Sequence, residues 1–132
     1  MNIHNFSIGD KKVLQASFTE EDVRVFSEIT GDTNKIHLDE SFASKSIFKS
    51  RIVHGFLVTS LFSRMFGTVF PGEGTIYLSQ SFKFLKPVYL NDEVVCEVVI
   101  TKINVERRII EFKTECLVKD KVVVAGIAEV MV

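Results

Sequence analysis

The sequence predicts an α+β domain in which an antiparallel sheet curls around one long buried helix. Residues 55–66 indicate the helix, because they are apolar on nearly every side and carry a single charge. Residues 75–132 indicate the sheet, because apolar and charged side chains alternate along successive segments. The chain of 132 residues has no linker, repeat or low-complexity segment, so we expect a single domain over 1–132.

The first expected elements are a short strand and an amphipathic helix. The strand lies around Val13–Phe18, and Thr19 caps a helix whose first turn, 20–22, is acidic. Gly31 ends this helix, which places Asp32 directly after it. The apolar side chains at helical spacing are Val23, Phe26 and Ile29.

Gly55–Phe66 is predicted to form the core helix. A helix that is apolar all round has to be enclosed by other elements. We therefore expect the sheet to wrap around it.

The second half of the chain is predicted to form the strands. A short strand is indicated by 82–84, where two phenylalanines flank a lysine, and Lys119–Lys121 supplies the turn before the last strand. The segments with period-two alternation are 94–100, 110–118 and 122–132.

The two cysteines, Cys96 and Cys116, fall at apolar positions of these strands. Buried free thiols are therefore the expected state, and a disulfide remains open at this level.

Charge and hydropathy exclude some classes of partner. The formal net charge of −1 provides no basic surface for nucleic acid or an anionic membrane. No apolar run has the length of a membrane-spanning helix, and no charged leader precedes an apolar stretch at the N-terminus. A cytoplasmic location is the resulting expectation.

The segment Thr30–His37, followed by Val53–Gly55, carries the candidate chemistry. A carboxylate at Asp32 and an imidazole at His37 can converge on one water molecule and exchange protons with it near neutral pH. The competing interpretation is turn chemistry, in which Asp32 and Asn34 bond their own backbone. Locally, turn chemistry is the commoner use of such residues.

Three segments together carry a resemblance to a known family: Phe26–His37, Ile52–Gly55 and Gly74–Leu78. They resemble the MaoC-like, (R)-specific enoyl-CoA hydratases, which adopt the hot-dog fold. The resemblance covers essentially the whole chain. One position departs from the family pattern, because Lys35 stands where a proline is usual, and this removes rigidity but no reactive group.

The resemblance implies reversible addition of water to a trans-2-enoyl-CoA, giving an (R)-3-hydroxyacyl-CoA. Asp32 and His37 are then the catalytic pair, and the backbone N–H of Gly55 donates to the thioester carbonyl. Ser63 is expected to steady the substrate or the water, unless its hydroxyl bonds back to its own helix. Asn34 belongs to the same substrate-binding site, where we expect it mainly to shape the loop.

The acyl chain has a candidate pocket at Phe62 and Phe66, near Met65 and Phe70, although these side chains are equally typical of a core. The bulk of the Phe66 ring, at a position resembling the family's acyl tunnel, favours short to medium chains. Neighbouring side chains can reopen such a cavity.

Cationic side chains after the catalytic segment have two interpretations. Lys45, Lys49 and Arg51 either meet the phosphates of CoA or form a solvated basic face.

The remaining histidine of the motif, His54, is expected to orient or pack against the site. A metal held by His37, Asp39 and His54 has no recognised ligand spacing, so we expect no metal and no cofactor.

The implied partners are an acyl-CoA thioester, or the same acyl group on an acyl-carrier protein, and a second copy of the chain. The resemblance implies a homodimer joined edge to edge into one continuous sheet. The alternatives on the same fold are a 3-hydroxyacyl-carrier-protein dehydratase, an acyl-CoA thioesterase and a non-catalytic acyl-binding module.

Overall fold

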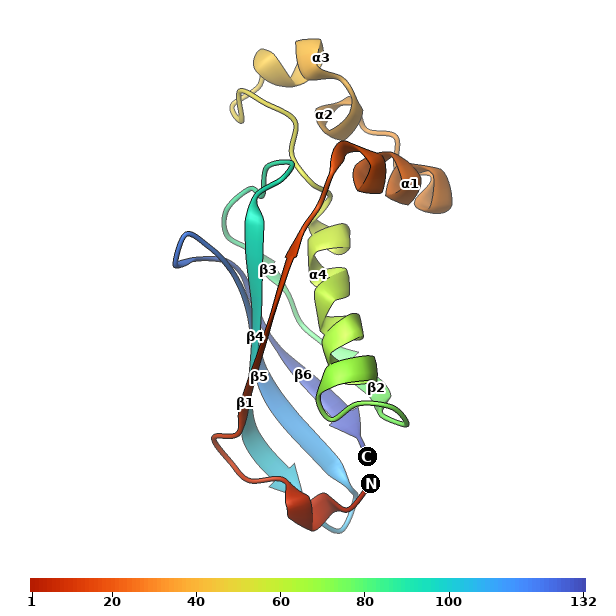
Figure 1. Cartoon of the computed structure of the whole chain (residues 1–132), viewed down its shortest axis with the longest axis vertical. Helices are drawn as coiled ribbons and strands as arrows, with labels where there is room; N and C mark the ends of the chain where they lie inside the picture. Colours follow the sequence, from red (N-terminus) through yellow and green to blue (C-terminus); the bar gives the residue numbers. More distant parts are fainter.

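The computed structural model describes residues 1–132 as a six-stranded antiparallel sheet with one long helix against it (Figure 1). The sheet order is β1-β4-β5-β6-β2, and β3 also pairs with β6. The α+β architecture predicted from the sequence is confirmed. The strands are β1 (Lys11–Ser17), β2 (Ile76–Gln80), β3 (Lys83–Phe84), β4 (Glu93–Asn104), β5 (Ile109–Val118) and β6 (Lys121–Met131).

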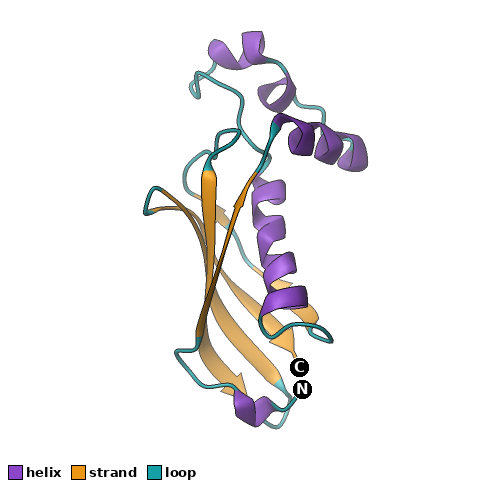
Figure 2. Cartoon of the chain, in the orientation of Figure 1, coloured by secondary structure: helices purple, strands orange, loops and turns teal.

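The helices divide into a long one along the sheet and a group of three at one end of the molecule (Figure 2). A 3₁₀ turn near the N-terminus and a π-helical turn after the long helix complete the set. The bounds are η1 (Ile3–Asn5), α1 (Glu20–Thr30), α2 (Lys35–Leu38), α3 (Glu40–Ser44), α4 (Gly55–Arg64) and η2 (Met65–Val69).

Helix α1 follows the sequence prediction at both ends. Thr19 caps it, accepting from Asp22 N, while the Asp22 side chain accepts from Thr19 N and completes a capping box. Gly31 has φ 78° at the C-cap, the left-handed conformation that glycine adopts without penalty. Asp32 is therefore the first residue after a firmly terminated helix.

The turn after Asp32 is short, and His37 lies on the short helix α2 that follows it. Asn34 accepts from Ile36 N and starts α2, and Asp39 accepts from Phe42 N and starts α3. Helices of one turn have no recurring apolar face, so their periodicity is not visible in the sequence.

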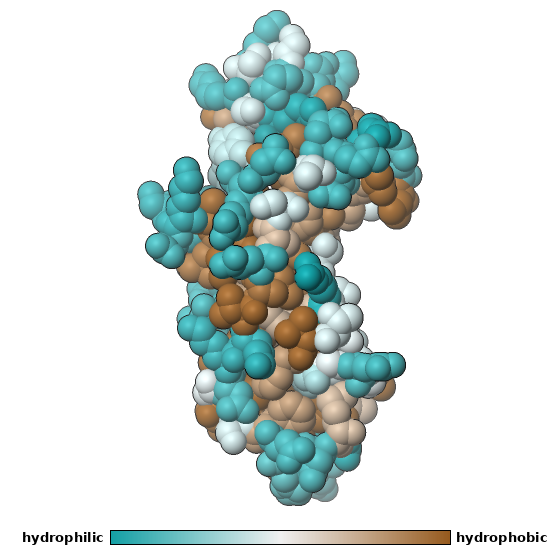
Figure 3. Space-filling model, viewed as in Figure 1, coloured by the Kyte–Doolittle hydropathy of each residue, from teal (hydrophilic) through white to brown (hydrophobic).

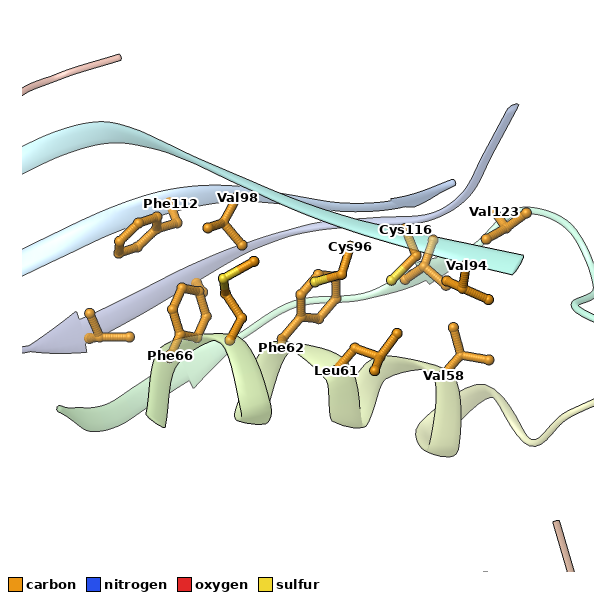
Figure 4. Close-up of a cluster of buried hydrophobic side chains, with 14 of the residues drawn as sticks. Val58, Leu61, Phe62, Phe66, Val94, Cys96, Val98, Phe112, Cys116 and Val123 are labelled. Carbon is orange, nitrogen blue, oxygen red and sulfur yellow. The ribbon is translucent and has the colours of Figure 1, made fainter. Parts of the chain in front are cut away.

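The hydrophobic core lies between α4 and the sheet (Figure 4). On α4 the side chains of Val58, Leu61 and Phe62 point at the strands, and all are less than 5% exposed. Cys96 and Cys116 are directly opposite each other on β4 and β5, buried and free, as expected.

Helix α4 is less enclosed than its composition predicts. The sheet covers one side only, whereas Phe56 is 67% exposed and Ser60, Ser63 and Arg64 are also exposed. The expectation of a helix buried on every side is wrong for a single chain, because one curled sheet covers only the face that it contacts. Exposed apolar side chains are visible on the same face of the molecule as polar ones (Figure 3). None of the helices has both the length and the apolar character needed to span a bilayer.

Candidate active site

A pocket of about 400 Å³ opens where the end of α1, the start of α4 and strand β3 meet. Its polar side chains gather on one side, and its remaining wall is largely apolar. The lining includes Asp32, His37, His54 and Gly55 together with Phe26, Phe48, Ile52, Phe56, Phe84, Leu85, Lys86 and Val88.

Asp32 and His37 both reach this pocket, as the sequence predicts. A carboxylate oxygen of Asp32 and one ring nitrogen of His37 lie within 4.8 Å of each other. Two groups at this spacing can share one bridging water, because each hydrogen bond to it spans about 2.8 Å. Asp32 also accepts from Asn34 N at 3.3 Å, so the turn interpretation describes one of its bonds. A carboxylate retains further lone pairs for a second partner.

The tautomer of His37 follows from its buried bond. The imidazole is 8% exposed, and Nδ1 lies 2.8 Å from the main-chain oxygen of Ile52. A carbonyl oxygen only accepts, so Nδ1 carries the hydrogen of the neutral ring. The Nε2 lone pair is left free to take a proton, which is the arrangement a general base requires.

His54 packs directly against His37. The two rings stack with centroids 3.8 Å apart and planes inclined by 27°. His54 Nε2 lies 3.0 Å from Ser27 Oγ and 3.2 Å from the main-chain oxygen of Asp32. Burial, together with the nearby His37, lowers the pKa of His54 below its ordinary value of 6.5. His54 therefore stays neutral at physiological pH. Its contacts with His37, Ser27 and Asp32 are those that an orienting residue would make.

The structure alters the set of residues that could hold a metal ion. Asp32, His37 and His54 each offer a ligand atom, all within 4.8 Å of one another. Asp39, considered from the sequence, instead caps α3. One nitrogen of each histidine is already engaged in a protein hydrogen bond. The expectation of a metal-free site stays a prediction.

Gly55 is the first residue of α4 and lines the pocket. The N-cap position before it holds His54, whose side chain makes no capping bond, and no backbone carbonyl accepts from the N–H groups of Gly55 and Phe56. A Cβ at Gly55 would lie 2.6 Å from the Phe84 ring, so only glycine fits beneath that ring as it is placed. The free amides and the positive end of the helix dipole favour a developing negative charge here.

Ser63 is not brought to this pocket. It is exposed on α4 and lines a separate groove beside β2. Phe62 and Phe66 are also elsewhere, because both are at most 1% exposed and belong to the core. Phe66 packs against Tyr77 and Phe112. Neither ring lines the pocket, so the acyl-pocket interpretation of these rings, with the chain-length expectation drawn from Phe66, stays a prediction.

The apolar wall of the pocket is built by residues that sequence reasoning did not single out. Phe56 from α4 and Phe84 from β3 have centroids 6.0 Å apart and are both more than half exposed. Periodicity marks such side chains as apolar but does not show which of them turn away from the core.

Arg51 is already engaged within the protein. Its Nε donates to the main-chain oxygen of His37 at 2.7 Å, and its guanidinium contacts Glu20 at 3.2 Å. This ties the end of α2 to the start of α1. Lys45 and Lys49 are exposed, as expected of a solvated face.

Comparison with known proteins places this geometry in a family. Residues 7–122 match the family model described as "MaoC like domain". The chain belongs to the MaoC-like family. The hot-dog fold and the family resemblance seen in the sequence are confirmed.

Two curated MaoC-like relatives match over most of their length. The "(R)-specific enoyl-CoA hydratase" of Rhodospirillum rubrum is 40% identical over 124 residues, 94% of this chain and 86% of that protein. The "3-hydroxybutyryl-CoA dehydratase" of Methylorubrum extorquens is 39% identical over 97% of this chain and 82% of that protein. Among solved structures, the (R)-hydratase from A. caviae involved in PHA biosynthesis superimposes with a TM-score of 0.94 at 37% identity, covering 96% of this chain and 97% of that one.

Proposed function

We propose that this protein is an (R)-specific enoyl-CoA hydratase, a hydro-lyase that adds water reversibly to trans-2-enoyl-CoA. The observation that carries the proposal is the pairing of the Asp32 carboxylate with the His37 imidazole in a pocket that also contains the uncapped start of α4. The names of the relatives at about 40% identity support the same reaction.

The reaction requires a base, a proton donor and a site for negative charge. Asp32 and His37 hold one water between them, and this pair removes a proton as the water oxygen attacks C3 of the enoyl thioester. The electrons move toward the thioester oxygen, where the N–H of Gly55 and the helix dipole stabilise the charge. The pair then returns a proton to C2, so that the atoms of one water are added. The two residues act as one unit, and the proton is not assigned to either.

A substrate assay tests the reaction class. With crotonyl-CoA we expect the absorbance of the conjugated thioester to fall without release of free thiol. Thiol release would instead identify a thioesterase, and no change in either signal would leave only an acyl-binding module. A coupled dehydrogenase specific for the (R)-3-hydroxyacyl product checks the handedness. Comparing crotonyl-CoA with the crotonyl carrier-protein thioester separates the hydratase from the carrier-protein dehydratase.

We also infer that two copies form a homodimer through the sheet edge built by β2 and β3. This edge and the adjoining side of α4 expose Phe56, Leu78, Phe84 and Leu85, each by at least 44%. The opposite edge, β1, begins with two lysines and is a poorer apolar surface. A second copy would cover the side of α4 that one sheet leaves open, next to the pocket.

Sedimentation analysis tests this association. We expect a dimer for the wild type and a monomer for Leu85→Glu, because a buried charge at an apolar interface is costly. Ile8→Glu is the matched control, since Ile8 is 70% exposed and lies before β1 at the other edge. A monomeric wild type, or dissociation by both substitutions alike, would contradict the assignment of this edge.

A further inference from the structure

His54 occupies the N-cap position of α4 but does not cap it. Serine, threonine, aspartate and asparagine are the usual residues at this position, because their side chains accept from the first helical amides. The His54 side chain instead turns to the end of α1, where its Nε2 meets Ser27 Oγ and the main-chain oxygen of Asp32. The ring lies between His37, at 3.8 Å, and Phe26, at 4.8 Å between centroids.

The hydrogen-bond partners determine the tautomer of His54. The Asp32 carbonyl only accepts, so Nε2 must carry the hydrogen. Nδ1 is buried and has no hydrogen-bond partner in the protein. A hydrogen on Nδ1 would be a buried donor without an acceptor, which is costly, so both observations assign the same tautomer.

The same arrangement keeps His54 uncharged. A protonated ring would bury the Nδ1–H without an acceptor and would place a cation against the face of His37. The charged or titratable groups facing the ring are His37, from α2, and Asp32, from the loop after α1. The lowered pKa of His54 agrees with this geometry. The side chain is thus a neutral donor with one fixed orientation.

We propose that His54 is a positioning residue whose Nε2–H holds the Asp32 main chain while its ring supports the face of His37. One side chain thereby contacts both members of the catalytic pair and fixes the direction in which each presents its proton-handling atom. This role rests on the proposed hydratase function. His54 itself does not touch the reacting atoms.

Two amide substitutions distinguish hydrogen bonding by Nε2 from packing of the His54 ring, because each places its amide nitrogen near a different nitrogen of the imidazole. In His54→Gln the amide nitrogen reaches the place of Nε2 and can donate to Asp32, whereas in His54→Asn it reaches only the place of Nδ1. We expect His54→Asn to lower kcat about 10- to 100-fold with KM changed less than about threefold, because a misplacement of about 1 Å in the catalytic geometry can cost about 100-fold. His54→Gln should keep a kcat at least about tenfold above that of His54→Asn.

A third variant, His54→Phe, keeps an aromatic ring between Phe26 and His37 but has no donor. We expect it to match His54→Asn in kcat. Equal kcat for the Gln and Asn variants, or a His54→Phe enzyme as fast as the wild type, would overturn the role of Nε2. If the Asn or the Phe variant does not fold, as judged by circular dichroism, the other still provides the non-donor to compare with His54→Gln. If His54→Gln does not fold, the two non-donor variants are compared with the wild type, and wild-type kcat in either would overturn the role of Nε2. A wild type that does not hydrate enoyl-CoA overturns the proposed function and this role together, whereas an active wild type with equal variants overturns this role alone.

Discussion

Replacing Asp32 by asparagine removes the charge of one carboxylate and little else. Asp32 is exposed, and the side-chain oxygen of asparagine can still accept from Asn34 N, the one hydrogen bond that the carboxylate makes. We therefore expect the free energy of unfolding to change by no more than about 0.5 kcal/mol, as for other surface substitutions. The fold and the loop stay in place while the pair loses its anionic member.

The effect on the reaction should be far larger. General acid–base catalysis contributes about 10²- to 10⁴-fold, so Asp32→Asn should lower kcat on crotonyl-CoA by that factor. At about 1.36 kcal/mol for each tenfold change, the activation barrier rises by roughly 2.7–5.4 kcal/mol. The assay is the loss of enoyl-thioester absorbance, measured beside a urea unfolding curve of the same preparation.

Asp39→Asn is the matched control. Asp39 lies seven residues further on, accepts from Phe42 N at 3.0 Å and does not line the pocket. Asparagine is as good an N-cap as aspartate, so this variant should keep its activity and its stability. An Asp32→Asn enzyme that hydrates crotonyl-CoA at the wild-type rate would refute the pairing of Asp32 with His37. Equal losses for the two variants would show a general effect of the loop charge.

Three further outcomes follow from the site. Gly55→Ala keeps the backbone N–H, but its Cβ should hinder the thioester carbonyl from reaching that N–H, so kcat should fall by up to about 10²- to 10³-fold, the contribution of one oxyanion donor. The loss should persist in Gly55→Ala/Phe84→Ala, whereas recovery in the double variant would attribute it to the 2.6 Å overlap with the Phe84 ring. Because the pKa of His54 is lowered in the folded protein, the unfolded chain binds more protons below about pH 6.5, so stability is full above that pH and declines as the pH falls. Urea unfolding at pH 7.5 and 5.0 should show a smaller decline for His54→Gln, and an equal decline would exclude His54 as its source. Dialysis against EDTA should leave the hydration rate within about twofold, whereas a loss restored by Zn²⁺ would identify a metal at Asp32, His37 and His54.

The elements that could be predicted from the sequence are those determined by neighbouring residues. Thr19 and Gly31 bound α1 through local hydrogen bonds and a local backbone conformation, and both ends were predicted correctly. The turn at Lys119 and Asp120 is similarly local, because both residues take positive φ in a two-residue hairpin. The alternation of buried and more exposed side chains in β4 and β5 could also be predicted from the sequence, because each strand turns one face to the core.

The pocket wall could not be predicted in this way, because helical and strand spacing report which side chains are apolar and not what they face. Phe62 and Phe56 lie on the same helix, yet one is buried against the sheet and the other is 67% exposed beside the pocket. The contact of Phe84 with Gly55 joins residues far apart in the chain through the placement of the two-residue strand β3. Such contacts depend on the register of the whole sheet.

The same reasoning explains why a histidine precedes the glycine that starts α4. A capping serine or aspartate would satisfy the first amides of the helix and leave less of its positive end available to a ligand. His54 leaves the Gly55 and Phe56 amides without a protein acceptor and uses its side chain to contact Asp32 and His37. His54 is therefore a poor helix cap, but it connects the two halves of the proposed site. One half is the pair that we propose holds the water, Asp32 after α1 and His37 on α2; the other is the pair of amides at the start of α4 that we propose stabilise charge. Substituting His54 by serine should supply a helix cap worth about 1 kcal/mol but leave a cavity beside Phe26 and His37 and separate these halves, so the hydration rate and the free energy of unfolding should both fall.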